Sequence, residues 1–328
     1  MPGMKLLAAV LVIPALLGCS KSGAKGPFAA HVGPVLCVAY SYDGAMIATG
    51  GQDKTVRIWD AQTGKLVETL AGHSGPVTAL AFTPDRITLA SGSWEDGSVR
   101  FWKLRDWSLI RTTAVPGGAR ALAYTGDSNR LVVGGGSQVA VLLDVVRGTK
   151  IADLDTHQAG GVPCVAASAD GLVVATGSGL NTSDARVKIW AAIGGQEGAS
   201  VQMNDGMVLG VAFNSAGSVL VTGSVNQSIM AWDTATLKPV GAMGKFCDAT
   251  GSLSLAFSTD GKFLASGHPD RTVRIWNTEN WIQASVLRGH AGPVNGIAWS
   301  LDGARLVSVS QDGGILRWEA ATGRRLAP

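Results

Sequence analysis

The chain has 328 residues, of which 44 are glycine, 46% are hydrophobic and only 16% are charged. Without a collagen period or low-complexity tracts, this composition favours many short strands joined by tight turns. The net charge is only +3 and the lysines and arginines are scattered, which argues against nucleic acid as a partner.

The N-terminal segment has the pattern of an export signal. Lys5 precedes an apolar run, Leu6–Leu17. This run is too short to span a bilayer, which takes about 20 residues, but it fits a signal-peptide core. It ends in Leu16–Cys19, "LLGC", which resembles the lipobox of bacterial lipoproteins. Synthesis starts at either Met1 or Met4, and both starts preserve the pattern.

The lipobox resemblance implies that Cys19 carries acyl chains that hold the protein in a membrane. It divides the chain into a signal peptide at 1–18, a lipidated, flexible tether at 19–27 and a folded part at 28–328. An ordinary secretory signal with an incidental cysteine is the alternative. Ser20 after the cysteine, rather than an aspartate, favours the periplasmic side of the outer membrane over the outer side of the cytoplasmic membrane.

From about residue 28 the chain repeats one pattern. Seven units end 41 to 47 residues apart, at Asp60, Lys103, Asp144, Ala191, Asp233, Asn277 and Glu319. Each unit alternates short apolar segments with turns, as in "VTALAF", "TLASGS" and "SVRFW". In "TVRIWD", Val56 and Ile58 alternate with Arg57 and Trp59, which is the period of a strand. Four such strands per unit predict an antiparallel meander.

The repeat resembles the WD-repeat β-propeller family, because Gly-His, a turn Asp and Trp-Asp return in register. The resemblance implies an all-β fold, namely a seven-bladed β-propeller of four-stranded antiparallel blades around a channel. A single blade cannot bury both of its faces, so closure of the ring completes the core. Either Gly26–Ala29 or the C-terminal "TGRRLAP" supplies the closing strand, and the sequence leaves both possibilities open.

The family also has a structural tetrad, a hydrogen-bonded chain of His, Ser or Thr, Asp and Trp. Three units match it, with His31, Thr49, Asp53 and Trp59; His73, Ser91, Asp96 and Trp102; and His290, Ser308, Asp312 and Trp318. An indole N–H only donates and a carboxylate only accepts, so the hydroxyl and the imidazole relay between them. Such a trio also suggests a hydrolase, but its return in three units favours a structural role. We therefore expect no catalytic residues, no metal site and no cofactor.

The middle units depart from this pattern. The third has Ser137 in place of the Asp and Leu143 in place of the Trp. The fourth, fifth and sixth keep Trp190, Trp232 and Trp276 but have no histidine in register. We expect these blades to rely on apolar packing, and the third to be the least protected by hydrogen bonds.

Partners of this family usually dock on the face made by the loops that enter the first strand and join the second to the third. Unusual residues in such loops are our candidates for partner binding: Trp94, Glu95, Asn181, Phe246 and His268. An exposed tryptophan is an effective anchor at an interface. Packing of Trp94 on a neighbouring loop is the alternative.

Together these patterns predict a monomeric, non-enzymatic scaffold, anchored by lipid in the bacterial cell envelope, that docks a protein or peptide. The alternative is an enzyme or small-ligand-binding propeller that uses the central channel. The inner segments "VLCVAY", "VTALAF" and "VLGVAF" are apolar or small and supply no chemistry for that alternative.

Overall fold

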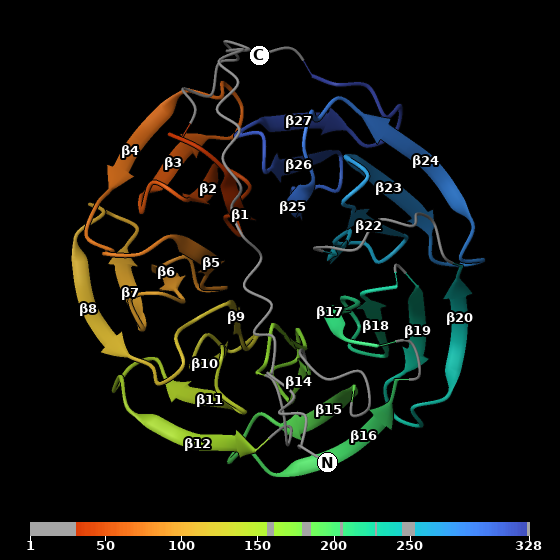
Figure 1. The fold of residues 1–328 in the computed structure, drawn as a ribbon, viewed down its shortest axis with the longest axis horizontal. Coiled ribbons are helices and arrows are strands. Elements are labelled where there is room, and N and C mark those ends of the chain that lie inside the picture. The colour runs from red at the N-terminus through yellow and green to blue at the C-terminus, as the bar shows by residue number, and fades with distance from the viewer. Residues whose placement is uncertain are drawn as a thin grey trace, which may run out of the picture.

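The computed structural model describes residues 31–155, 161–178, 185–203, 206–226, 228–244 and 253–326. These residues form seven antiparallel sheets, arranged as blades around a central axis (Figure 1). The predicted all-β, seven-bladed propeller is therefore confirmed. The signal peptide, Cys19 and the tether lie outside the described residues, which contain no helix long and apolar enough to cross a membrane.

Each blade is a meander that runs from an inner strand at the axis to an outer strand at the periphery (Figure 1). The strands of blades one to four are β1 (Val35–Tyr40), β2 (Met46–Gly51), β3 (Val56–Asp60), β4 (Leu66–Leu70), β5 (Val77–Phe82), β6 (Thr88–Ser93), β7 (Ser98–Lys103), β8 (Leu109–Ala114), β9 (Ala121–Tyr124), β10 (Arg130–Gly134), β11 (Val139–Asp144), β12 (Lys150–Asp155), β13 (Cys164–Ala167), β14 (Val173–Gly177), β15 (Arg186–Ala191) and β16 (Glu197–Gln202).

Blades five to seven follow the same order. Their strands are β17 (Val208–Phe213), β18 (Val219–Ser224), β19 (Ile229–Asp233), β20 (Pro239–Met243), β21 (Ser254–Phe257), β22 (Phe263–Gly267), β23 (Thr272–Asn277), β24 (Gln283–Arg288), β25 (Val294–Trp299), β26 (Arg305–Ser310) and β27 (Ile315–Glu319). We call the face formed by loops that enter the inner strands and join second to third strands the upper face. The opposite face is the lower face.

Blade seven differs from the others because its sheet has three strands within the described residues. After β27, Arg325 forms an antiparallel bridge with Trp318, and the Leu326 amide donates to the Arg317 carbonyl. The C-terminal residues therefore begin a fourth strand on β27. Gly26–Ala29, the other predicted closing segment, lies outside the described residues.

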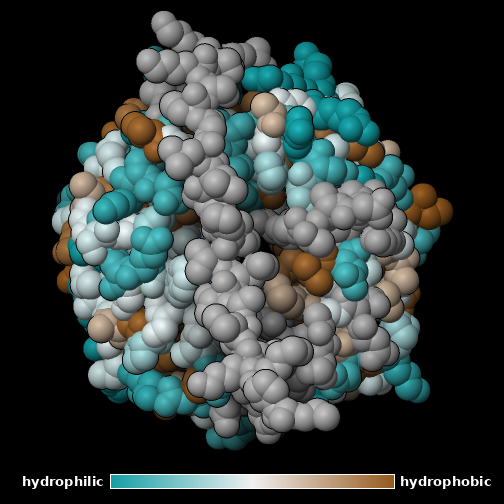
Figure 2. All heavy atoms as spheres, viewed as in Figure 1, coloured by the Kyte–Doolittle hydropathy of each residue, from teal (hydrophilic) through white to brown (hydrophobic). Residues whose placement is uncertain are grey.

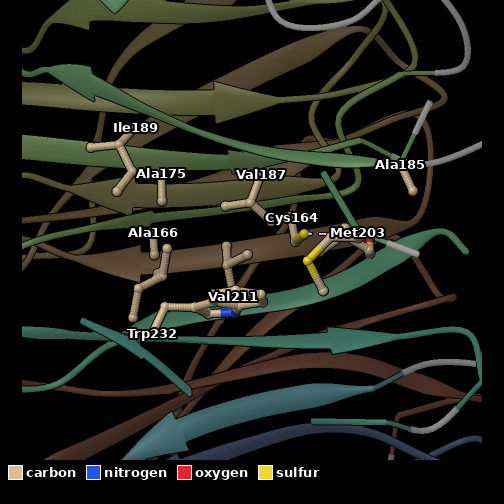
Figure 3. Packing of buried hydrophobic residues seen from close by; sticks show 11 residues of the cluster. Cys164, Ala166, Ala175, Ala185, Val187, Ile189, Met203, Val211 and Trp232 are labelled. Carbon is tan, nitrogen blue, oxygen red and sulfur yellow. Dashed lines mark hydrogen bonds between the residues drawn. The ribbon is translucent and has the colours of Figure 1, made fainter. Parts of the chain in front are cut away.

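The core lies between the blades rather than within any one of them. Each of the seven buried apolar clusters draws on two neighbouring blades, and one joins blade seven to blade one. Figure 3 shows the cluster between blades four and five, where Cys164 and Met203 lie near Val211 and Trp232. Closure of the ring therefore completes the core, because every sheet needs a neighbour on each side.

Close contact between blades explains part of the high glycine content. In six blades a glycine lies near the upper end of the second strand: Gly50, Gly92, Gly134, Gly177, Gly223 and Gly267. A Cβ at Gly50 would lie 2.6 Å from Val77 Cγ1 of the next blade, closer than carbon atoms approach. Blade seven has Val309 there instead, and Gly296 on its own inner strand makes room.

Candidate functional site

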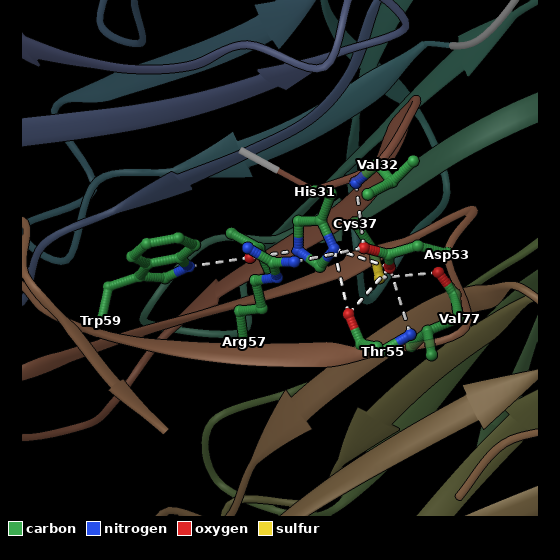
Figure 4. Close-up of polar contacts among 9 residues, drawn as sticks. His31, Val32, Cys37, Asp53, Thr55, Arg57, Trp59 and Val77 are labelled. Carbon is green, nitrogen blue, oxygen red and sulfur yellow. Dashed lines mark hydrogen bonds and ion pairs between the residues drawn. The ribbon is translucent and has the colours of Figure 1, made fainter. Parts of the chain in front are cut away.

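Blade one contains an unbroken chain of polar side chains (Figure 4). The Trp59 indole N–H donates to Thr49 Oγ1 over 2.8 Å, and that hydroxyl lies 2.8 Å from His31 Nε2. His31 Nδ1 in turn lies 2.8 Å from a carboxylate oxygen of Asp53. A neutral imidazole that accepts at Nε2 and donates at Nδ1 fits this geometry.

Blade two has the same chain, and blade seven has part of it. His73 lies 2.7 Å from Asp96 and 2.8 Å from Ser91 Oγ, which also accepts from Trp102. In blade seven, the Ser308 hydroxyl forms hydrogen bonds with both His290 Nε2 and the Trp318 indole N–H. However, His290 Nδ1 lies 3.7 Å from Asp312, too far for a hydrogen bond, and this last link is open.

Burial keeps the two complete relays in the required protonation state. Desolvation lowers the pKa of His31 and of His73, although the hydrogen bond to the neighbouring aspartate opposes this shift. Burial alone would raise the pKa of Asp53 and of Asp96, but hydrogen bonds outweigh it and lower both values. Neutral histidines enclosed beside ionised aspartates hold the blade together and have no access to a substrate.

His268 is a correction to the prediction of a partner-binding residue in a surface turn. The side chain is completely buried, and its Nε2 lies 2.7 Å from Ser266 Oγ, which accepts from Trp276. Blade six thus supplies its histidine from the turn between β22 and β23, two residues after the serine, rather than from the preceding loop. His268 is a structural residue, because no partner can reach it.

Blade three replaces the polar chain by apolar side chains. Val115, Val133 and Leu143 stand in place of the histidine, the hydroxyl residue and the tryptophan, and all three are buried in one cluster with Phe101 of blade two. Ser137, in the aspartate position, donates to the Val139 carbonyl instead. Because the histidine, hydroxyl and tryptophan positions are all apolar in blade three, no polar group at these three positions is buried without a hydrogen bond.

Among the described residues of the upper face, Trp94, between β6 and β7, is an exposed aromatic residue. It keeps 40% of its surface exposed and lines a hollow of about 450 Å³ with Glu95, Gly97, Gly117, Gly118 and Gly136. Its indole also contacts the neighbouring blade, because the Arg120 guanidinium stacks over the ring at 3.9 Å. Trp94 therefore packs on a neighbouring loop and also stays accessible, and its role as a partner anchor stays a prediction.

Glycines of blade three make this hollow possible. A Cβ at Gly118 would lie 2.1 Å from the Trp94 carbonyl oxygen, and one at Gly136 would lie 2.8 Å from the indole nitrogen. Gly117 and Gly118 also have φ angles of +82° and +72°, a region that side chains disfavour. The loop between β8 and β9 can therefore pass close under Trp94 because positions 117 and 118 are glycine.

The sequence reasoning missed Arg120, which contacts Trp94. A comparison of equivalent positions in the seven inner segments would have found it, because the others are Leu36, Thr78, Pro163, Leu209, Leu253 and Asn295. Arg120 is the only charged residue in this set. Of the remaining candidates, Glu95 is exposed at the hollow, whereas Asn181 and Phe246 lie outside the described residues.

The lower end of the channel carries a second, smaller hollow of about 210 Å³. Its lining is aromatic and hydroxylic, with Tyr42, Tyr124, Phe213, Phe257 and Thr259 among the residues that contribute. No charged residue lines it. Across the described part of the chain, no three His, Cys, Asp or Glu side chains gather as a metal site would require.

The fold and its tetrads define a β-propeller of the WD-repeat class, and comparison with known families agrees. The family described as "WD domain, G-beta repeat" matches residues 24–60, 64–103, 148–191, 198–233, 245–277 and 281–319. The chain belongs to this family, whose members commonly bind protein partners. The unmatched interval 104–147 contains β9, β10 and β11 of blade three, the blade without a relay.

Similar curated proteins share this chain's repeats at low identity. Protein tipD of Dictyostelium discoideum is 25% identical over 312 residues, which cover 91% of this chain and 49% of tipD. Nuclear distribution protein nudF of Aspergillus niger is 24% identical over 320 residues, which cover 91% of this chain and 62% of nudF. Autophagy-related protein 16 of Arabidopsis thaliana is 25% identical over 295 residues, which cover 88% of this chain and 56% of that protein. The chain spans about half the length of these relatives.

Proposed function

We propose that this protein is a non-enzymatic, lipid-anchored scaffold of the bacterial cell envelope that docks a protein or peptide on its upper face. The observation that carries the docking proposal is Trp94, which is partly exposed in a hollow and held by a neighbouring blade. A preorganised aromatic side chain loses little freedom on binding, which suits an anchor. Loops on a rigid ring of blades supply the surrounding surface.

The anchoring part of the proposal rests on the sequence of Leu6–Cys19 and is tested separately. We expect Cys19→Ala to move the protein from the membrane fraction to the soluble fraction. Cys37→Ala, a change at a thiol desolvated between blades, is the matched control and should leave the protein in the membrane. Density-gradient separation of the two membranes then tests the outer-membrane assignment. Retention of Cys19→Ala in the membrane fraction would overturn lipid anchoring.

The docking part is tested by crosslinking in intact cells and affinity purification. We expect one envelope protein to be recovered reproducibly with the wild type and at least tenfold less with Trp94→Ala. Ile110→Ala, at a side chain 49% exposed on outer strand β8, controls for loss of apolar surface. Equal recovery of the envelope protein with Trp94→Ala and with the wild type would exclude the hollow as the docking site. A bound metabolite without any protein partner would favour the channel, where the lower hollow lies.

A further inference from the structure

Arg120 departs from the other residues at the upper ends of the inner strands. At the equivalent positions, the Thr78 hydroxyl donates to the Ala119 carbonyl and the Asn295 amide to the Val35 carbonyl, each in the next blade. These short side chains tie one blade to the next. Arg120 instead turns back to blade two and lies over Trp94. Its guanidinium therefore lies against Trp94, the residue whose indole also lines the hollow.

The Arg120 guanidinium has no acidic counterpart in the described part of the chain. Ion pairs join other arginines to carboxylates, such as Arg274 to Asp270 at 2.7 Å, but no described carboxylate lies within ion-pair distance of Arg120. The side chain is partly buried, and desolvation lowers the pKa of Arg120. A guanidinium has five N–H donors, and stacking on an indole satisfies none of them.

We propose that Arg120, stacked on Trp94 beside the hollow, is a carboxylate-binding site that receives an acidic side chain of the docked segment. This inference rests on the proposed docking function and names the chemistry that it recognises. The planar guanidinium offers two parallel donors to a carboxylate, and the indole holds it in place. The exposed part of Trp94 then packs against an apolar residue next to the acidic one.

Glu95 restricts the ligand further. It lies at the same hollow, exposed, and its carboxylate repels a second negative charge. A single carboxylate is held by Arg120, whereas a phosphate group with nearly two negative charges meets more repulsion from Glu95. An aspartate or glutamate side chain is the ligand that we assign to the site, and a phosphorylated residue is the competing ligand that the test compares with it.

The test uses the full-length protein and immobilised libraries of random heptapeptides. Three libraries share a fixed leucine, preceded by glutamate, glutamine or phosphoserine. We expect the wild type to be retained at least tenfold more strongly on the glutamate library than on either other library, because a charge-assisted pair is lost with glutamine. Arg120→Gln should abolish the preference, and Arg120→Lys should reduce it. Lys54→Gln removes an exposed cation from the upper turn of blade one and should preserve it.

The outcomes separate this inference from the docking proposal. Equal retention on the glutamate and glutamine libraries, or a preference that survives Arg120→Gln, would overturn carboxylate recognition. Stronger retention on the phosphoserine library would overturn the assignment to a carboxylate. If capture of the envelope protein in cells is lost with Trp94→Ala but kept with Arg120→Gln, the docking proposal is supported and the role of Arg120 is wrong. Thermal unfolding of each variant confirms that the ring is intact.

Discussion

Blades two and three are neighbours with the same strand order but different interiors. Blade two links Trp102, Ser91, His73 and Asp96 by hydrogen bonds, whereas blade three fills the equivalent space with Val115, Val133 and Leu143. Both form four-stranded sheets. This difference shows that apolar packing between blades is sufficient to form a four-stranded blade. The relay adds a tie between the upper loops and the strands below them.

The same difference shapes the candidate site. In blade two the His73 loop is fixed to Asp96, which also accepts from the Ser74 amide. In blade three, without these side chains, glycines form the upper loop and allow close contact with Trp94. The hollow therefore lies where a blade with a relay meets a blade without one.

Breaking the relay of blade two should have the largest effect on stability. Ser91→Ala leaves both the His73 imidazole and the Trp102 N–H buried without their partner. At about 1–3 kcal/mol for each of the two unsatisfied groups, we expect a loss of about 2–6 kcal/mol in the free energy of unfolding, measured by urea denaturation. Ser91→Thr is the matched control, because blade one has Thr49 in this position. A loss below 0.5 kcal/mol with Ser91→Ala would contradict the account.

Acid should weaken the blades that contain histidine. Burial lowers the pKa of His268 to about 4, from an ordinary value near 6.5. Between these values the unfolded chain binds a proton that the folded chain does not, so stability falls as the pH falls from about 6.5 to 4, by roughly 3 kcal/mol. His31 and His73 shift in the same direction. Carboxylates with lowered pKa values reduce the free energy of unfolding only at more acidic pH, where they become protonated.

Urea denaturation at pH 7 and at pH 4.5 measures this acid sensitivity. His268→Gln should reduce the dependence on pH, whatever its effect at pH 7. Hydrogen exchange, corrected for the intrinsic rate at each pH, should show loss of protection in blades one, two and six and little change in blade three. A uniform loss over all blades would contradict the assignment to the histidines.

Adding a hydroxyl to blade three should also destabilise the protein, but by less. Val133→Thr places an O–H among Val115 and Leu143, where no relay partner is present. We expect a loss of about 1–3 kcal/mol in the free energy of unfolding. Ile110→Thr, on the exposed outer strand, should be nearly neutral. A higher free energy of unfolding for Val133→Thr would show that the apolar packing of Val115, Val133 and Leu143 does not stabilise blade three.

The smallest expected effect is a local difference in protection. Because no relay ties its upper loop, we expect amides at the upper ends of β9 and β10 to exchange faster at pH 7 than their equivalents in blades one, two and seven. Native-state hydrogen exchange with mass spectrometry resolves these segments. Slower exchange in blade three would reverse the comparison.

Sequence periodicity predicted repeated four-stranded units, because each unit ends at the same Trp-Asp-like position, and the resemblance to the WD-repeat family implied their arrangement as a propeller. It did not predict the role of His268, since a histidine two residues after Ser266 reaches the same space as one from the preceding loop, and only the fold shows this. Likewise, Arg120 and Trp94 are in different units, and their contact depends on how two blades pack. Residues that act across blades carry no fixed spacing in the chain.

The most direct test of the central claim is photocrosslinking from the hollow itself. A photoreactive phenylalanine analogue at position 94 in living cells should give one discrete crosslinked protein, and the Arg120→Gln background should weaken that product. The same analogue at position 110, on the outer strand, should not give it. The same product from both positions, or none from position 94, would contradict docking at the hollow between blades two and three.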